Sequence, residues 1–347
     1  MTSGVASPVL VTAGGLTVDC VVGLDGRLGL NQMGGNAAYA AAGARLWVSP
    51  IGLIGRVPTP YPDSWLEALS ARGVDVGGVA RVDAGIDAPG WLIHQADGER
   101  RDHLYGAPAL LADAGLPLDR LDAAQITRLE RLLASQTPPE RNYGAFRRAN
   151  LNDPSQVPDR YLGARGLHLA PDQPAPQKAL AALFRAGDAL ISLDSGSHGM
   201  AWPAATLREM IGLVDAFLPS QRELAAFFPD LPPAQALERL AGMTGAQLVA
   251  KLGPTGSLVW DRATGRAIQI PAVETTAIDP TGAGDAFCGG FLAGLALTSD
   301  PILAACQGAV SASFAIEGFG VDALLAADHA KAKTRLADLR GRIGAAP

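Results

Sequence analysis

Ile278-Asp279-Pro280-Thr281-Gly282-Ala283-Gly284-Asp285-Ala286-Phe287 is the stretch from which the rest of the chain can be interpreted. Its Gly-Ala-Gly turn leads into a segment, Ala286 to Leu297, with the composition of a helix. The first N–H groups of a helix have no partner within it, and the helix dipole adds positive charge there, so this turn suits a phosphate group. Asp285 would then accept the proton of a hydroxyl that attacks the phosphorus. The alternative is a plain helix cap.

Length and composition allow one large domain and argue against nucleic acid and the membrane as partners. The chain has 347 residues, of which 48% are hydrophobic and 18% charged, enough to bury a large core. Its net charge is −6 and it has no Lys/Arg run, so we expect no nucleic acid as partner. Met1 to Ser7 lacks the positive region of a signal peptide. The apolar stretch Phe291 to Ile316 is broken by Thr298-Ser299-Asp300-Pro301, which predicts two buried helices and no membrane span.

The cysteine pattern favours a cytoplasmic protein. Cys20, Cys288 and Cys306 have neither the spacing of a metal site nor that of a disulfide framework. We expect buried, reduced thiols. The five histidines are scattered, which argues against a catalytic zinc site.

Two predicted β ribbons occur in the first third of the chain. Thr17 to Leu30 turns at Asp25-Gly26, and Ala88 to Tyr105 turns at Asp97-Gly98. We expect the ribbons to pair into a small β-sheet lid formed by residues 16–33 and 88–106.

Elsewhere, short apolar runs alternate with helix-like segments. This alternation predicts an α/β fold with three layers, in which a mostly parallel central sheet of about eight or more strands lies between helices. In such sheets ligands bind at the carboxyl ends of the strands. The expected strands are 9–13, 48–54, 166–169, 189–194, 216–219 and 247–252, and the expected helices are 37–46, 63–72, 177–186, 202–211, 221–228 and 233–243.

Residues 110–158 do not fit this alternation. They contain two proline-rich patches and a charged, helix-like middle, Asp122 to Ser135. We expect an insertion within a single domain, 1–347. A surface excursion is preferred, and a part of a substrate or subunit contact is the alternative.

Six separated motifs occur in a fixed order along the chain. They are Gly14 to Asp19, Gly34-Gly35-Asn36 running into Gly43-Ala44-Arg45-Leu46, Ala88 to Arg100, Ser220 to Glu223, Lys251 to Gly256, and Asp279 to Gly290. This order resembles the ribokinase-like, or PfkB, family of sugar kinases over nearly the whole chain, apart from residues 110–158. The alanine-rich helix after Gly34-Gly35, and Tyr161 to Pro171, resemble the branch related to yeast MAK32.

The resemblance implies roles around the transferred phosphoryl group. Asp285 would be the catalytic base, and Gly282, Ala283 and Gly284 would form the anion hole. Substrate hydroxyls would be held by four residues near the lid: Asp19, Gly34, Gly35 and Asn36. The alternatives are a turn residue for Asp19 and a helix cap for Asn36. Other side chains that could face the sugar, although packing or surface positions are favoured for each, are Tyr39, Trp91, His94, Arg101, His103 and Tyr105.

The resemblance also implies sites for ATP and ions. Glu223 would organise Mg²⁺ through water, the alternative being a solvated helix face. Asp279 and Thr281 match positions where many members bind a monovalent cation, usually K⁺. The nucleotide would be contacted by Ser220, Lys251, Gly253, Thr255 and Gly256.

Three departures from the family pattern bear on these roles. Ser220 stands where asparagine is usual, which predicts a shifted metal site. Lys251 stands where many members have threonine, and it is either a phosphate contact or a solvated strand-end residue. Asp194-Ser195-Gly196-Ser197 replaces an Asp-Pro-Asn-x-Arg run, so one arginine contact is missing.

The sequence therefore predicts an ATP-dependent kinase that phosphorylates a hydroxyl of a small sugar or sugar-like substrate. A nucleoside or another small alcohol is the alternative substrate on the same fold. A family member that binds a ligand or partner and catalyses poorly is the alternative of another class, motivated by Ser220 and the altered run at Asp194. A homodimer formed through the lid is left open.

Overall fold

The computed structural model describes residues 6–84, 86, 90–94, 100–102, 121–134 and 143–344, without the side chains of 101, 102, 128, 129 and 131–134. Nine strands form the main sheet, in the order β13-β12-β11-β10-β9-β8-β1-β4-β5. The seven strands from β11 to β5 are parallel, and β12 and β13 add an antiparallel edge. The predicted mostly parallel sheet is confirmed. Its strands are β1 (Leu10–Gly15), β4 (Ile51–Pro58), β5 (Val74–Val82), β8 (Gly166–Leu169), β9 (Leu190–Leu193), β10 (Ala216–Phe217), β11 (Gln247–Lys251), β12 (Ser257–Asp261) and β13 (Arg266–Ile270).

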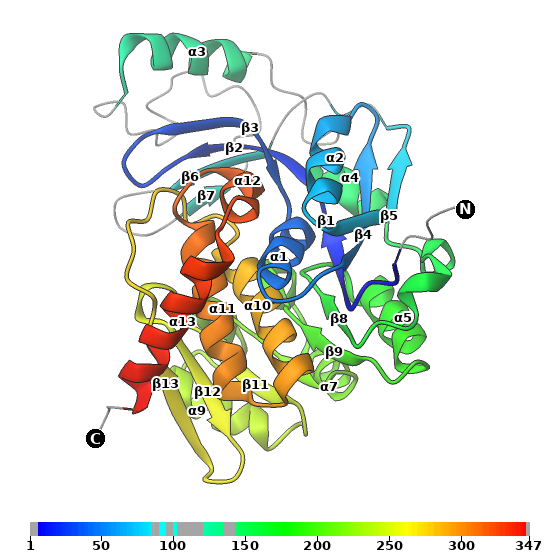
Figure 1. Ribbon diagram of the computed structural model, residues 1–347, viewed down its shortest axis with the longest axis vertical. Helices are drawn as coiled ribbons and strands as arrows, with labels where there is room; N and C mark the ends of the chain where they lie inside the picture. The colour runs from blue at the N-terminus through cyan, green and yellow to red at the C-terminus, as the bar shows by residue number, and fades with distance from the viewer. Residues whose placement is uncertain are drawn as a thin grey trace.

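Helices cover both faces of this sheet (Figure 1). Because side chains alternate along a strand, Leu10 lies in the core cluster that contains Phe291, and Val11 lies in the cluster that contains Leu237. The first layer contains α1 (Asn36–Arg45), α2 (Asp63–Ala71), α10 (Ala283–Thr298), α11 (Pro301–Ala315), α12 (Gly320–Leu325) and α13 (His329–Gly344). The second contains α5 (Pro174–Arg185), α7 (Ala204–Gly212), α8 (Gln221–Phe227) and α9 (Pro233–Ala241). The three-layer prediction is therefore confirmed.

The order of the strands indicates where a ligand would bind along the sheet's carboxyl edge. The chain runs from β1 through β4 to β5, then returns to place β8 on the other side of β1. Such a reversal of strand order separates the connections on either side and is where ligands bind in α/β sheets. The carboxyl ends of β1 and β8, at Gly15 and Leu169, border this point.

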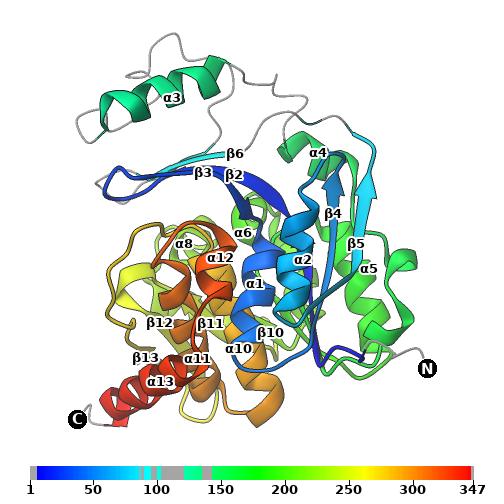
Figure 2. The ribbon, with the colours of Figure 1, turned by 45° about the horizontal axis from the view of Figure 1, so that its top comes forward.

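A second, four-stranded sheet lies over that edge (Figure 2). Its order is β3-β2-β6-β7, from β2 (Thr17–Val22), β3 (Leu28–Gly34), β6 (Gly90–His94) and β7 (Arg100–Asp102). Both ribbons are antiparallel, and they join through parallel pairing of β2 with β6. The predicted separate sheet is confirmed, while the expected Asp97-Gly98 turn lies outside the described residues.

The range 110–158 contains two differently placed parts. The expected helix is α3 (Ala123–Ala134), which lies beyond the lid sheet in Figure 2. Leu121 and Ile126 pack there with Trp91 of the lid. By contrast, α4 (Tyr143–Ala149) buries Tyr143 and Phe146 against the body, so this part is not a surface excursion.

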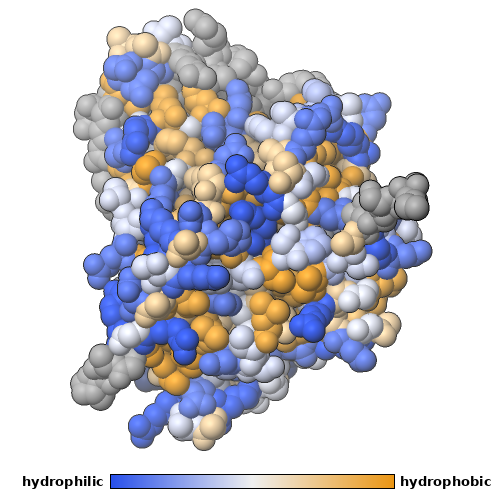
Figure 3. All heavy atoms as spheres, in the orientation of Figure 1, coloured by the Kyte–Doolittle hydropathy of each residue, from blue (hydrophilic) through white to orange (hydrophobic). Residues whose placement is uncertain are grey.

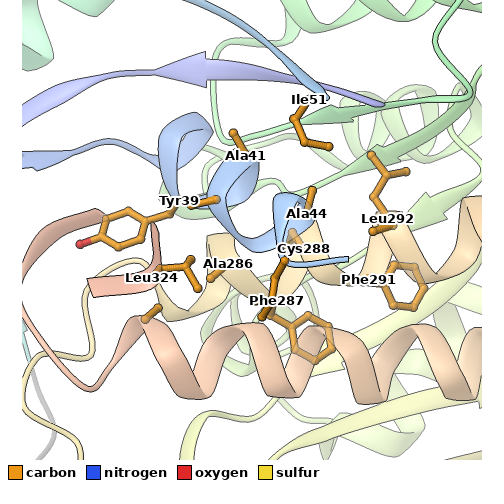
Figure 4. Packing of buried hydrophobic residues seen from close by; sticks show 14 of the residues in the cluster. Tyr39, Ala41, Ala44, Ile51, Ala286, Phe287, Cys288, Phe291, Leu292 and Leu324 are labelled. Carbon is orange, nitrogen blue, oxygen red and sulfur yellow. The ribbon is translucent and has the colours of Figure 1, made fainter. Parts of the chain in front are cut away.

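Helices α1 and α10 cross in close contact, with Ala44 of α1 near Cys288 of α10 (Figure 4). Two glycines permit this approach. A Cβ atom at Gly289 would overlap the carbonyl oxygen of Ala40, and one at Gly43 would overlap that of Ala286. The contact fixes where both helices begin, and these two starts lie under the lid.

Several predicted boundaries shift in the structure, among them the starts of α10 and β4. Helix α10 begins at Ala283, three residues before the expected start, because packing overrides the low helix propensity of Gly284. Strand β4 begins at Ile51, where its pairing with β1 starts, and not at Val48. The segment predicted as two buried helices does form α10 and α11, with Asp300 capping the second.

Several elements were not predicted from the sequence: β5, β12, β13, α4, α12 and α13. Strand β5 carries Gly77-Gly78 in its interior, which weakens a strand pattern. Among the described residues, no helix has both the length and the apolar character needed to cross a bilayer. Hydrophilic residues are spread over the face drawn in Figure 3.

Gly289→Ala should lower the free energy of unfolding by about 1–3 kcal/mol, because the added methyl group forces α1 and α10 apart. Gly212→Ala is the matched control, since Gly212 is exposed on α7 and a Cβ atom there meets nothing within 4 Å. Urea denaturation of both variants checks the claim. Equal stability of the two variants would contradict it.

Candidate active site

The first turn of α10 lies at the carboxyl edge of the main sheet, under the lid. Gly282 is the N-cap in a left-handed conformation (φ 76°), and a Cβ atom there would overlap the ring of Tyr39. The Asp279 carboxylate accepts the Thr281 N–H at 2.8 Å and shapes the preceding loop. Gly282, Ala283 and Gly284, the residues expected to form an anion hole, are thus the cap and first turn of the helix itself.

Asp285 occupies this first turn and retains partial exposure. Burial, together with the negative charge of Asp194, raises the pKa of Asp285 to about 7, while Lys251 acts in the opposite direction. A carboxyl with a pKa near neutrality is suited to accept a proton from a hydroxyl and to release it again.

Lys251 and Asp194 form an ion pair beside the anion hole. The Lys251 side chain is 11% exposed, its Nζ lies 3.5 Å from Cys288 Sγ, and it is 3.6 Å from the Cβ position of Gly284. Burial alone would lower the pKa of Lys251, but the charge of Asp194 raises it overall, so the ammonium stays charged. The solvated strand-end alternative for Lys251 is wrong.

Glu223 is buried at the start of α8, which excludes the solvated-face alternative. It forms a capping box with Ser220: the Ser220 hydroxyl accepts the Glu223 N–H, and Glu223 Oε2 accepts the Ser220 N–H at 3.0 Å. The Ser195 hydroxyl donates to the same oxygen at 3.1 Å. Burial and the charge of Asp194 raise the pKa of Glu223.

The expected substrate residues lie where the lid strands β2 and β3 meet the start of α1. Asp19 is buried, and its carboxylate packs so closely on Gly34 that a side chain there would displace it. Gly35 is the N-cap of α1, so Asn36 is not a plain cap. Asn36 instead accepts the Gly15 N–H at 2.7 Å and donates to the Pro171 carbonyl at 2.8 Å, and these contacts join the ends of β1 and β8.

The turn after β11 is an open part of the site. Gly253 and Thr255 are exposed, Gly256 is partly exposed, and the turn follows Lys251 directly. The Thr255 hydroxyl donates to the Leu252 carbonyl at 3.0 Å. This exposure is compatible with the expected nucleotide contact.

Sequence reasoning missed Arg147 and Asp172. Arg147 of α4 donates to the Pro171 carbonyl at 2.5 Å and lies 3.9 Å from Asp172, next to Asn36. Nothing in the local sequence indicates this placement, because α4 reaches the end of β1 only through the fold. The side chains of Trp91 and Tyr39 are buried in packing, as favoured, whereas that of Arg101 and residues His103 and Tyr105 lie outside the described part.

His94 was expected to be a packing or surface residue, but it bonds to the loop before the anion hole. Its Nε2 lies 2.9 Å from Thr281 Oγ1 and 3.2 Å from Asp279 Oδ1. Asp279 is fully buried, and its Oδ2 has no hydrogen-bond partner within the described part of the chain. That part also contains no cluster of three or more His, Cys, Asp or Glu residues able to hold a metal directly.

Replacing Asp285 by asparagine should make stability less dependent on pH. The folded-state pKa of about 7 lies above the ordinary value of 3.8, so ionisation of Asp285 costs stability as the pH rises between these values. Asp285→Asn should therefore gain about 1–3 kcal/mol over the wild type near pH 8 and much less near pH 5, measured by urea denaturation. A constant difference between the two pH values would show that Asp285 titrates normally.

Comparisons with known proteins identify the family and the fold of the chain. The model of the pfkB family of carbohydrate kinases matches residues 109–327. A cytidine kinase of Thermococcus kodakarensis is 27% identical over 288 residues, which cover 82% of this chain and 87% of that protein.

Two solved structures show the same ribokinase-like fold. A double mutant of fructokinase from Vibrio cholerae O395, with fructose, ADP and potassium ion bound, has a TM-score of 0.68 and 19% identity, covering 96% of this chain and 99% of its own. A putative ribokinase II from E. coli, in complex with ATP and Mg²⁺, has a TM-score of 0.65 and 17% identity, covering 96% and 100%. The relatives are kinases, which supports an ATP-dependent kinase. Because the family model matches more than half of the residues, the chain belongs to the pfkB family of carbohydrate kinases.

Proposed function

We propose that the protein transfers the γ-phosphoryl group of ATP to a hydroxyl of a small sugar or sugar-like substrate. One observation carries this proposal: Asp285, with a pKa of about 7, stands in the first turn of α10 beside three residues suited to bind phosphate. In the proposed reaction Asp285 accepts the hydroxyl proton while the oxygen forms a bond to the γ-phosphorus. The bond from that phosphorus to the β-phosphate oxygen breaks, and ADP leaves.

The backbone N–H groups of Gly282, Ala283 and Gly284 would stabilise the charge that develops on the transferred group. They belong to the cap and first turn of α10, whose dipole adds positive charge at this end. Tyr39 lies beneath this turn, against Gly282. The Ala283 N–H, which donates to the Pro280 carbonyl at 3.3 Å, would leave that bond to face the phosphate.

In other family members an arginine contributes positive charge near the phosphates or the substrate. This chain lacks that arginine, and Lys251 would supply the charge instead. Its ammonium is 3.6 Å from the Cβ position of Gly284, so a phosphate on the anion hole would lie within its reach. Asp194 holds the ammonium in place before the nucleotide binds. Gly253, Thr255, Gly256 and Ser220 are proposed to border the nucleotide.

The residues present fit a water-mediated Mg²⁺ at Glu223. Mg²⁺ keeps several waters and is bound by few carboxylates together with substrate phosphates. The pKa of Glu223 is raised by burial and by Asp194, and a nearby divalent cation would relieve both effects. When bound, Mg²⁺ would neutralise phosphate charge.

A monovalent cation also fits Asp279. Its Oδ2 is buried without a partner among the described residues, and a buried carboxylate oxygen is costly unless something pairs with it. We propose K⁺ there, with Thr281 alongside, supplying charge next to the anion hole. The fructokinase structure from Vibrio cholerae contains potassium ion, which agrees with this choice.

A nucleoside is the second candidate substrate. The cytidine kinase relative aligns with 82% of this chain, which favours a substrate that carries a ribose. The buried aromatic rings of Tyr39 and Trp91 do not offer a slot for a base, since both pack in core clusters. The sugar-binding residues Asp19, Gly34, Gly35 and Asn36 would serve either substrate.

The weakly catalytic alternative loses much of its motivation. Ser220 has a structural task as the cap of α8, and Asp194 has one as the partner of Lys251. Neither departure therefore indicates a lost site. A cytoplasmic location and a homodimer through the lid remain proposals, and α3 with Leu121 already covers one face of that sheet.

Asp285→Asn should lower kcat by about 10²- to 10⁴-fold while leaving ATP binding intact, because the amide cannot accept the proton. ADP release with Mg²⁺ and K⁺ across sugars, sugar acids, polyols and nucleosides identifies the substrate first. Asp230→Asn, at an exposed site, is the control. An Asp285→Asn enzyme with wild-type turnover would refute the proposed base.

Lys251→Met should destabilise the protein by about 3–5 kcal/mol, because Asp194 is left buried and unpaired. The double variant Lys251→Met/Asp194→Asn should recover stability yet keep a KM for ATP raised about 10-fold or more, an energy of about 1.4 kcal/mol. Chemical denaturation and initial rates separate the two effects. A stable double variant with wild-type KM for ATP would reduce Lys251 to a structural ion-pair partner.

A further inference from the structure

We propose that His94 is a positioning residue that fastens the lid to the loop preceding the anion hole, so that water is kept from the γ-phosphate while the substrate hydroxyl reacts. The inference rests on the proposed function. It assigns a task to a lid side chain that lies 187 residues from its partner in the sequence.

The contacts of His94 are specific and buried. Its Nε2 faces both Thr281 Oγ1 at 2.9 Å and Asp279 Oδ1 at 3.2 Å, and only 8% of the residue is exposed. A carboxylate oxygen can only accept, so the ring nitrogen that faces Asp279 carries hydrogen. One imidazole nitrogen therefore connects the lid to two side chains of the same loop.

Strand β6 carries this histidine on the face that covers the site. Trp91 and Ile93 point to the other face, where they pack with Leu121. On the inner face, the Cβ position of Gly90 is 3.3 Å from Asp19 Oδ1, and His94 lies at the opposite end of the strand. One short strand thus extends from the substrate residues to the phosphate loop.

Side chains from two elements contact the loop where it joins α10. Tyr39 of α1 lies against Gly282, and His94 of the lid holds Thr281, the residue before it. Asp279 adds the Thr281 N–H bond from within the loop. The shape of the anion hole therefore depends on whether the lid is closed.

The lid hairpin has its own anchors, which do not involve His94. The Leu24 N–H donates to the Ile278 carbonyl at 3.0 Å, and the ring of Phe319 packs against Gly23 and Gly29. A variant at position 94 should therefore keep a folded lid. What it loses is the contact of strand β6 with Asp279 and Thr281.

Loss of this contact has a chemical signature. With the lid fastened, each ATP consumed yields one ADP and one phosphorylated product. When water attacks in place of the substrate hydroxyl, the γ-phosphoryl group becomes inorganic phosphate, and ADP forms without product. Lid closure suppresses this side reaction by excluding water.

The test compares His94→Ala, His94→Phe and His94→Gln in the full-length enzyme. The Ala and Phe variants lack the donor, so kcat should fall about 10- to 100-fold and the ratio of ADP to product should rise above one. The glutamine amide restores a donor and should return both values close to wild type. Arg27→Ala, which breaks an exposed pair at the hairpin tip, should change neither.

Hydrogen exchange gives a readout that needs no substrate. Amides of residues 90–94 and 278–284 should exchange faster in the Ala and Phe variants than in the wild type, and His94→Gln should protect them again. A wild type that phosphorylates nothing would sink the proposed function, while exchange would still test the fastening. Wild-type exchange and an unchanged ADP-to-product ratio in His94→Ala would overturn this inference and leave the kinase proposal standing.

Discussion

The close crossing of α1 and α10 is the constraint on which the site depends. Gly43 and Gly289 let the two backbones approach closely, so that Gly43 lies against the Ala286 backbone and Gly289 lies against the Ala40 backbone. This approach places the start of α10, with its phosphate-binding turn, next to the start of α1, with Asn36. Tyr39 then lies directly beneath Gly282. The substrate side and the phosphate side of the site are thus built on one rigid pair of helices.

Around this pair the protein concentrates charges that would be costly elsewhere. Asp194 and Lys251 are buried as an ion pair, and Glu223 and Asp285 lie close enough for Asp194 to raise their pKa values. Buried ion pairs contribute little net stability, so this arrangement is better explained by function than by folding. A bound Mg²⁺ would bring positive charge to this cluster of three carboxyl groups and one ammonium. The same reasoning applies to Asp279 Oδ2, which is buried and has no hydrogen-bond partner among the residues that the structure describes.

The fold could be predicted from sequence because its signals are local and repeated. Alternating strands and helices indicated the parallel sheet, and the two ribbons indicated the lid. The start of α10 was placed late, because Gly284 and Gly282 disfavour a helix locally and only contact with Tyr39 fixes the turn. Ser220-Gln221-Arg222-Glu223 carries the signature of a capping box, a role that the family resemblance obscured.

The contacts of the site were harder to predict because they join distant segments. Lys251 and Asp194 are 57 residues apart, and His94 and Thr281 are 187 apart. Arg147 reaches Pro171 from a segment that has no recognisable motif. Sequence patterns identify which residues suit a reaction, whereas only the strand order determines which of them meet.

The most direct measurement of the central claim is a crystal structure with Mg²⁺ and a non-hydrolysable ATP analogue. The account predicts the terminal phosphate at the N–H groups of Gly282, Ala283 and Gly284, with Asp285 facing its phosphorus atom. It also predicts Lys251 within contact distance of a phosphate oxygen. A nucleotide bound with its phosphates away from the start of α10 would contradict the account.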